Sequence, residues 1–277
     1  MSTLTISAAD VNKLRQMTGA GMMDCKKALA EANGDFEKAI DELRKRGQKV
    51  AANRADRETK EGYIMAKTNA DATKGYLLGL TCETDFVGKS ADFTTFVDAV
   101  LDIAMNNNAK TVEEILSLPM QGVKVSDKLS DQIGKIGEKM EFIAYDIIEA
   151  PKVVIYIHPG NKVVSMVGVS SANGADAGKD VAMQIAAMNP VALDKDDVDP
   201  KIIEREIEIG KEQARQEGKP EAMIEKIALG KLNKFYQEST LLNQSFIKDE
   251  KKTIRQYLDG VEKGLTVTKF KRVQIGG

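Results

Sequence analysis

Residues 82–88, Cys-Glu-Thr-Asp-Phe-Val-Gly, lie where the sequence pattern changes from extended to helical. An apolar run precedes this stretch, and Ser90 after it can cap a helix. Phe86 is one of eight phenylalanines and directly follows an acid, outside both periodic patterns. Two interpretations of Phe86 are open. It packs on the core beneath Phe93 and Val97, or it is presented for contact with another molecule.

The segments on both sides of this stretch predict a strand–strand–helix unit. Residues 62–81 alternate around a central turn, which indicates a β-hairpin, and the residues after Ser90 carry a helical stripe. The same order returns near residues 153–188, after a further predicted strand at 141–148. We therefore predict an α+β fold whose core has two similar subdomains with antiparallel sheets and helices.

The first fifty residues predict a small module of three helices. Ser7 and Asp10 have capping-box spacing, and glycine-containing breaks at 18–21 and 33–35 separate three apolar stripes. A core of this size is marginal alone, so the module is either a docking unit or a plain structural bundle. The charged connector at 44–60 contains acids and no aromatic residue, which favours a solvated helix end and linker over an RNA site.

Residues 199–235 carry the strongest helical signal in the chain. Gly218-Lys219-Pro220-Glu221 reverses the chain between two helical stretches. We predict a projecting antiparallel hairpin that is stabilised by a second copy or a partner, unless it packs back on its own domain. Small and apolar residues have coiled-coil spacing along its first helix: Ile203, Ile207, Gly210 and Ala214.

Composition limits the possible functions. The chain has 40 Lys+Arg against 42 Asp+Glu, so no basic excess points to nucleic acid. Cys25 and Cys82 lack partners at metal-ligand spacing, which is typical of reduced thiols in the cytoplasm. We find no signal-peptide pattern and no apolar run of the about 20 residues that span a membrane.

Few residues in the chain are suited to catalysis. His158 is the single histidine, tryptophan is absent, and no phosphate-binding loop, nucleophile elbow or zinc cluster occurs. Glu83 and Asp85 lack a third ligand that would hold a metal ion. The sequence therefore favours a protein that is not an enzyme and that uses no cofactor.

Several motifs closely resemble the bacterial elongation factor Ts family, in the same order and over nearly the whole chain. The motifs are TGAGMMDCKKAL at 18–29, NGD at 33–35, ETDFV at 83–87, GKPE at 218–221, residues 231–236 and LLNQ at 241–244. The first and third are long and specific. Gly88 departs from the family pattern, in which alanine usually follows TDFV.

The resemblance implies a nucleotide-exchange factor for elongation factor Tu, the GTPase that carries aminoacyl-tRNA. It implies no covalent chemistry and no direct contact with nucleic acid. It also implies an organisation in five parts: a module like a ubiquitin-associated domain with its linker at 1–54, a core N-subdomain at 55–140, a core C-subdomain at 141–186 and 230–264, an inserted coiled coil at 187–229, and a tail at 265–277.

The resemblance further implies which residues contact the partner. Thr84, Asp85, Phe86 and Val87 would lie beside the magnesium and nucleotide site of the GTPase, with Asp85 and Phe86 as the intruding pair. The alternative function is a non-catalytic chaperone or adaptor that binds the GTPase or a peptide through the N-terminal module. A homodimer through the 199–235 hairpin is a further expectation. The other implied contact residues are Met22, Met23, Lys26, Ile136, Gly137, His158, Ile247 and Lys248.

Overall fold

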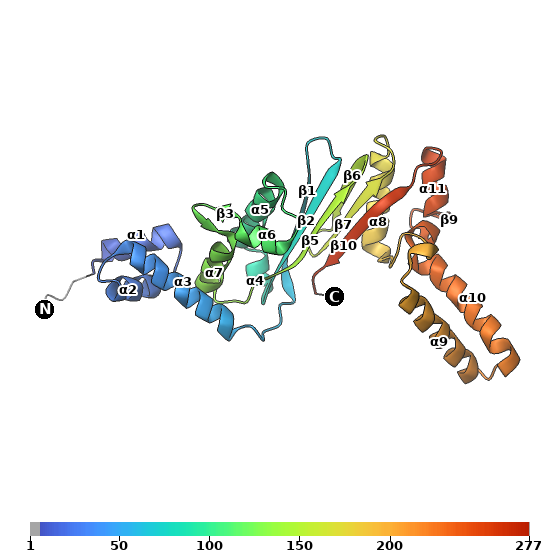
Figure 1. Ribbon diagram of the computed structural model, residues 1–277, viewed down its shortest axis with the longest axis horizontal. Coiled ribbons are helices and arrows are strands. Elements are labelled where there is room, and N and C mark those ends of the chain that lie inside the picture. The colour runs from blue at the N-terminus through green and yellow to red at the C-terminus, as the bar shows by residue number, and fades with distance from the viewer. Residues whose placement is uncertain (1–5, 277) are drawn as a thin grey trace.

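The computed structural model describes residues 6–276, which form an elongated molecule (Figure 1). A three-helix module lies at the N-terminal end, two sheets with their helices lie in the middle, and a helical hairpin projects at the other end. Residues 1–5 and residue 277 lie outside the described residues. The first five belong to the predicted module and to the segment in which no signal-peptide pattern was found, and residue 277 belongs to the predicted tail. Within residues 6–276, no helix has the length and apolarity needed to cross a bilayer.

The N-terminal module consists of α1 (Ala8–Thr18), α2 (Met22–Glu31) and α3 (Phe36–Asn53). The Ser7 hydroxyl accepts a hydrogen bond from the Asp10 amide, as the capping pattern predicts. Leu14, Cys25 and Leu29 are fully buried between the helices. The three helices are therefore confirmed, while the likeness to a ubiquitin-associated domain stays a prediction.

A close helix crossing joins this module to the core. The C-terminal half of α3 packs on α7 (Val125–Ile136), where Gly47 faces Gly134. A Cβ atom on Gly47 would lie 2.5 Å from the Ser130 carbonyl oxygen, and one on Gly134 would lie 2.8 Å from the Gly47 Cα. Only glycine permits this approach, because the atoms in the way belong to the backbone.

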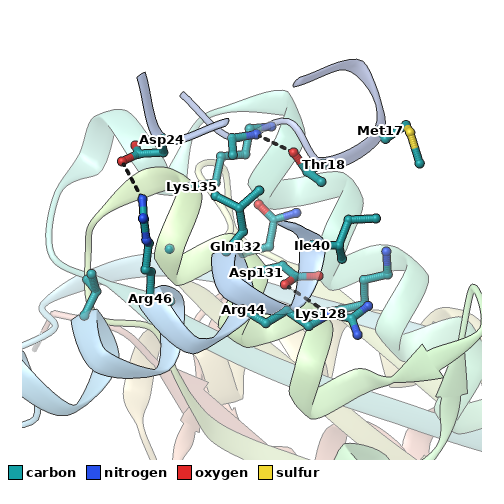
Figure 2. A pocket seen from close by; sticks show the side chains of 15 residues that line it. Met17, Thr18, Asp24, Ile40, Arg44, Arg46, Lys128, Asp131, Gln132 and Lys135 are labelled. Atoms are coloured by element: carbon teal, nitrogen blue, oxygen red, sulfur yellow. Dashed lines mark hydrogen bonds and ion pairs between the residues drawn. The ribbon is translucent and has the colours of Figure 1, made fainter. Parts of the chain in front are cut away.

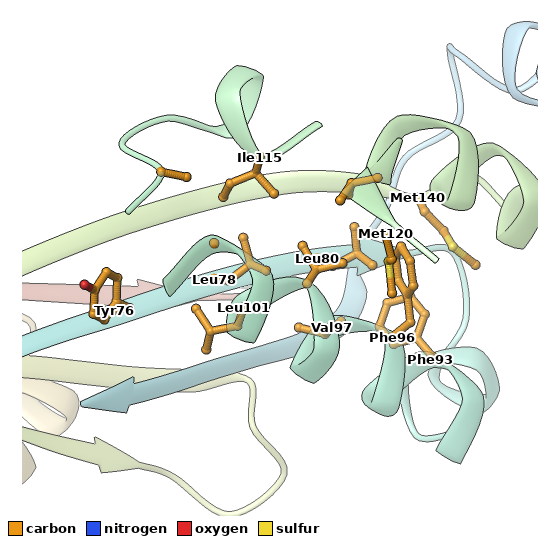
Figure 3. Close-up of a cluster of buried hydrophobic side chains, with 14 of the residues drawn as sticks. Tyr76, Leu78, Leu80, Phe93, Phe96, Val97, Leu101, Ile115, Met120 and Met140 are labelled. Carbon is orange, nitrogen blue, oxygen red and sulfur yellow. The ribbon is translucent and has the colours of Figure 1, made fainter. Parts of the chain in front are cut away.

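The first sheet has the antiparallel order β1-β2-β5. Alternate residues of β2 face a helical layer, so Leu78 and Leu80 pack against Phe93 and Leu101 (Figure 3). Ser90, as predicted, caps one helix of this layer, and Thr111 caps another. The elements are β1 (Glu61–Thr68), β2 (Lys74–Cys82), β5 (Glu141–Glu149), α4 (Asp85–Gly88), α5 (Ala91–Asn106), α6 (Val112–Ser117), β3 (Pro119–Met120) and β4 (Val123–Lys124).

The second sheet has the antiparallel order β10-β7-β6 and a separate apolar layer on its outer face. Val167 and Val169 of β7 pack there against Val181 and Ile185 of α8. The elements are β6 (Lys152–Ile157), β7 (Val163–Val169), β10 (Val267–Gln274), α8 (Ala175–Met188), η1 (Lys195–Asp197), η2 (Leu241–Asn243), β8 (Ser245–Phe246), β9 (Asp249–Thr253) and α11 (Ile254–Val261).

The inner faces of the two sheets share a third apolar cluster. Ile64 and Leu77 of the first sheet are buried there with Val164 and Met166 of the second. The core is thus layered as helices, sheet, sheet and helices (Figure 1). The predicted α+β fold with two antiparallel sheets is confirmed.

Two of the predicted subdomain boundaries separate strands that pair with each other. β5 pairs with β2, although the boundary at residues 140 and 141 assigned it to the C-subdomain. β10 pairs with β7, so the predicted tail at 265–277 supplies a strand to the second sheet. Both strands pair with a strand that is distant in the sequence, and periodicity does not identify such a partner.

The hairpin predicted at 199–235 consists of α9 (Pro200–Gln216) and α10 (Glu221–Ser239). Its buried seam contains Gly210, Ala214, Ile224, Ala228 and Leu232. Beside this seam, Lys231 donates hydrogen bonds to Gln213 and Glu217. The hairpin projects from the core rather than packing back on it (Figure 1).

Candidate partner-binding site

The short helix α4 presents Phe86 to solvent. Val87 packs against the core of the first sheet, and Gly88 is buried against Gly62 of β1. Phe86 directly precedes Val87 on the same helical turn, so its side chain points away from this core. Phe86 is 85% exposed. Phe93 is buried without it. The interpretation in which Phe86 packs on its own core is therefore wrong.

The two acids beside Phe86 do not converge. Asp85 forms an ion pair with Lys89 at 2.7 Å, and this hydrogen bond lowers the pKa of the Asp85 carboxyl. Glu83 turns instead toward the end of α3. Within residues 6–276, no group of three or more acidic, histidine or cysteine side chains could hold a metal ion.

Glu83 connects three segments of the chain. Its carboxylate accepts a hydrogen bond of 2.7 Å from the Lys139 backbone amide. The Arg54 guanidinium, just beyond α3, donates to both carboxylate oxygens at 2.8 and 3.0 Å. The Lys139 amide first, and Arg54 second, hold the pKa of Glu83 below its ordinary value of 4.5.

The lowered pKa of Glu83 predicts a pH dependence of folding. The hydrogen bonds of the ionised Glu83 carboxylate contribute their full stabilisation above the pKa that Glu83 has in the unfolded chain. This stabilisation is lost as the pH falls through the lower pKa of Glu83 in the folded protein. We expect Glu83→Gln to reduce the free energy of unfolding at about pH 7, with the difference from wild type closing below about pH 4. Urea unfolding of both proteins across this range measures it. A difference that does not change with pH would refute the assignment.

Glu138 holds the segment that leads into α4. Its carboxylate accepts hydrogen bonds from the Glu83 amide at 3.1 Å, the Thr84 amide at 3.0 Å and the Thr84 hydroxyl at 2.6 Å. The Thr84 hydroxyl is therefore committed to Glu138 and does not cap α4. The sequence did not single out Glu138 or Arg54 by any pattern. Its one available signal was that Glu138 directly follows the predicted contact residues Ile136 and Gly137.

Ile136 and Gly137 lie beside the TDFV segment. Ile136 ends α7 and packs partly on the first core. Gly137 has a φ of 77°, a left-handed conformation that favours glycine and turns the chain toward Glu138. The structure therefore brings together two of the predicted contact segments, 84–87 and 136–137.

The other predicted contact residues lie elsewhere on the surface. Met22 and Met23 begin α2 and are 56% and 65% exposed, with Lys26 exposed one turn later. His158 follows β6, and its Nδ1 lies 3.1 Å from the Tyr156 hydroxyl. In the β8–β9 turn, Ile247 is 41% exposed and Lys248 pairs with Asp180. These residues form several separate surfaces rather than one pocket.

A cavity of about 350 Å³ lies between the N-terminal module and α7 (Figure 2). Arg44 faces Asp131 at 3.7 Å, and Arg46 faces Asp24 at 3.9 Å. Burial raises the pKa of Asp131, and the nearby Arg44 charge opposes this effect. Among the lining residues, these two pairs leave no nucleophile with an adjacent base. No sequence pattern predicted this cavity.

The family model described as Elongation factor TS matches residues 83–277. The chain belongs to the elongation factor Ts family. It is 57% identical over 275 residues to elongation factor Ts of Cytophaga hutchinsonii, covering 98% of this chain and 99% of that protein. It is 51% identical to the protein of that name from Amoebophilus asiaticus, covering 99% of this chain and 100% of the relative.

The relative from Christiangramia forsetii is 52% identical, with 98% of this chain and 99% of that protein covered. The family match begins at Glu83 and thus includes the TDFV segment, Glu138 and the hairpin. The three relatives extend the likeness over nearly the whole chain, including the N-terminal module. The chain is accordingly a factor of translation elongation, as the motifs predicted.

Proposed function

We propose that this protein is a guanine-nucleotide exchange factor that binds elongation factor Tu carrying GDP and promotes GDP release. Asp85 and Phe86 are the residues that enter the magnesium and nucleotide site of the GTPase. The 85% exposure of Phe86 is the observation that most directly supports this proposal. An aromatic side chain with so little packing of its own keeps its apolar area available for a partner.

The energy required for exchange argues for several contact surfaces. A GTPase holds GDP and magnesium with backbone amides, a lysine and a hydroxyl. A thousandfold faster release requires about 4 kcal/mol of differential stabilisation. One buried aromatic side chain supplies about 1.5–3 kcal/mol. The exposed Met22, Met23 and Ile247 are suited to supply further binding energy and so to hold Phe86 in place.

Asp85 can change partners at little cost. Its ion pair with Lys89 is solvent-exposed on both sides, and such pairs contribute little to stability. The carboxylate can therefore leave Lys89 and take a new partner beside the magnesium site. No covalent bond is made or broken in this proposal, and no cofactor takes part.

Release of fluorescent GDP from elongation factor Tu tests the proposed function. We expect the protein to accelerate GDP release in a saturable manner. Excess GDP should weaken the complex between this protein and the GTPase, because the binding of GDP and the binding of this protein to the GTPase are thermodynamically linked. A chaperone or adaptor acting through the N-terminal module would bind the GDP-loaded and nucleotide-free GTPase equally well. Calorimetry with each form separates the two functions, and equal affinities would refute nucleotide exchange.

The cytoplasm as the place of action and the absence of direct nucleic-acid contact also belong to this proposal.

A homodimer through the hairpin stays a prediction. Ile209, Met223 and Leu229 leave apolar area exposed on α9 and α10, which a second copy could cover. Sedimentation of the wild type and a Met223→Ser, Leu229→Ser variant tests it. The same mass for both would count against a dimer through this surface.

A further inference from the structure

Two glutamates connect the loop after β2 with the loop after α7. Each glutamate lies in one loop and accepts hydrogen bonds from the other loop. The Glu138 carboxylate accepts from the Glu83 and Thr84 amides and the Thr84 hydroxyl. The Glu83 carboxylate accepts in return from the Lys139 amide. We propose that Glu138 is a positioning residue for nucleotide exchange, which with Glu83 fixes α4 to the end of α7 so that Phe86 and Ile136-Gly137 act as one rigid contact element.

The helix α4 needs an external support because it is a single turn. It contains four residues, and a helix this short has no stability of its own. Phe86 makes little contact with the protein and so cannot fix its own position. Val87 and Gly88 seat the helix on the first core, but the direction in which it starts depends on Glu83 and Thr84.

The bonds from Glu138 suit this role. A carboxylate accepts bonds that are stronger and shorter than those between neutral groups, and the Thr84 hydroxyl bond is 2.6 Å long. The acceptors and donors come from segments 54 and 55 positions apart in the sequence. The contacts therefore restrict the tertiary placement of α4 rather than its local conformation.

The same network reaches the N-terminal module. Arg54 follows α3 and binds Glu83, while the Lys139 side chain donates to the Ala55 carbonyl oxygen at 2.8 Å. The segment from α3 to β1 is thus attached to both loops. These contacts link the end of the N-terminal module to the loops that hold α4.

The inference rests on the proposed exchange function, and a double-mutant cycle tests it with the full-length protein. We expect Glu138→Ala to lower the maximal rate of GDP release about tenfold, because displacing a contact group by about 1 Å has effects of this order or larger. The factor concentration at half-maximal rate should change less, since Met22, Met23 and Ile247 are left intact. In a Phe86→Ala background, Glu138→Ala should cause less than about a twofold further loss, because it acts through Phe86.

Two further variants separate positioning from folding. Glu113→Ala removes an exposed glutamate on α6 and should leave the rate unchanged. Thr84→Val removes one of the three donors and should cause a smaller loss than Glu138→Ala, in the same direction. Thermal unfolding of each variant shows whether it is folded. If Glu138→Ala is not folded, Thr84→Val takes its place in the double-mutant cycle with Phe86→Ala.

The outcomes are distinguishable. If Phe86→Ala slows release but Glu138→Ala does not, the positioning role is wrong and the exchange function stands. Losses that multiply fully in the double variant would also overturn the inference, because Glu138 would then act independently of Phe86. If Phe86→Ala has no effect, the role proposed for Phe86 fails and this inference fails with it.

Discussion

Replacement of Phe86 by alanine is expected to slow factor-catalysed GDP release roughly 10- to 150-fold, since an aromatic group contributes about 1.5–3 kcal/mol on burial and about 1.4 kcal/mol corresponds to a factor of ten. Stability should stay within about 0.5 kcal/mol of wild type, because Phe86 packs against so little of its own chain. A large functional loss without a stability loss is the signature of a contact residue. Stopped-flow release of fluorescent GDP and thermal unfolding measure the two effects.

Met188→Ala provides a matched control for this prediction. Met188 ends α8 and is also a large exposed apolar side chain, but it is not among the predicted contact residues. We expect it to change neither the release rate nor the stability. Equal losses with Phe86→Ala and Met188→Ala would mean that general surface hydrophobicity, rather than the Phe86 position, drives release.

The second large effect is expected at the crossing of α3 and α7. Gly47→Ala places a Cβ atom 2.5 Å from the Ser130 carbonyl oxygen, so the two backbones must separate. We expect a loss of about 1–3 kcal/mol in the free energy of unfolding, the range for overpacked sites. The N-terminal module should also lose its fixed position on α7. Denaturant unfolding reports the first effect and amide exchange along α3 the second.

Gly230→Ala in α10 is the control for this substitution. Gly230 also lies inside a helix, but a Cβ atom there meets no atom within 4 Å. Alanine at this position should stabilise the protein by about 0.5–1 kcal/mol through helix propensity. If Gly47→Ala stabilised the protein as Gly230→Ala does, the close crossing of α3 and α7 would be incorrect.

Local patterns in the sequence predicted most elements of this fold. Alternation identified β1 and β2, and the possible cap at Ser90 identified the start of α5. In α6, Thr111 caps the helix while the Glu114 carboxylate accepts from the Lys110 amide, so only half of a capping box forms. These signals succeed because the interacting groups are within a few residues of one another.

The pairing of β5 and β10 was beyond the reach of such patterns. Each strand carries an ordinary extended signal, and its partner is selected by the packing of whole sheets. Met22 illustrates the same limit within one helix. It falls on the apolar stripe of Cys25 and Leu29, yet it lies outside the small core and is exposed.

The candidate site was only partly predictable. The resemblance marked the TDFV segment and Ile136-Gly137 and implied that Phe86 is presented to a partner, whereas the local sequence pattern left the direction of Phe86 open. A single residue at the junction of two patterns has no periodicity that assigns it to a face. The hydrogen bonds that Glu138 accepts and Arg54 donates were not predicted, because hydrogen bonds between distant loops leave no regular spacing in the sequence.

The affinity of this protein for the GDP-bound and the nucleotide-free GTPase, measured by calorimetry for wild type and Phe86→Ala, tests the central claim most directly. A group that expels GDP must bind the nucleotide-free state better, so the wild type should prefer that state strongly. Phe86→Ala should reduce this preference roughly 10- to 150-fold. An unchanged preference in the variant would contradict the claim that Phe86 weakens the hold of the GTPase on its nucleotide.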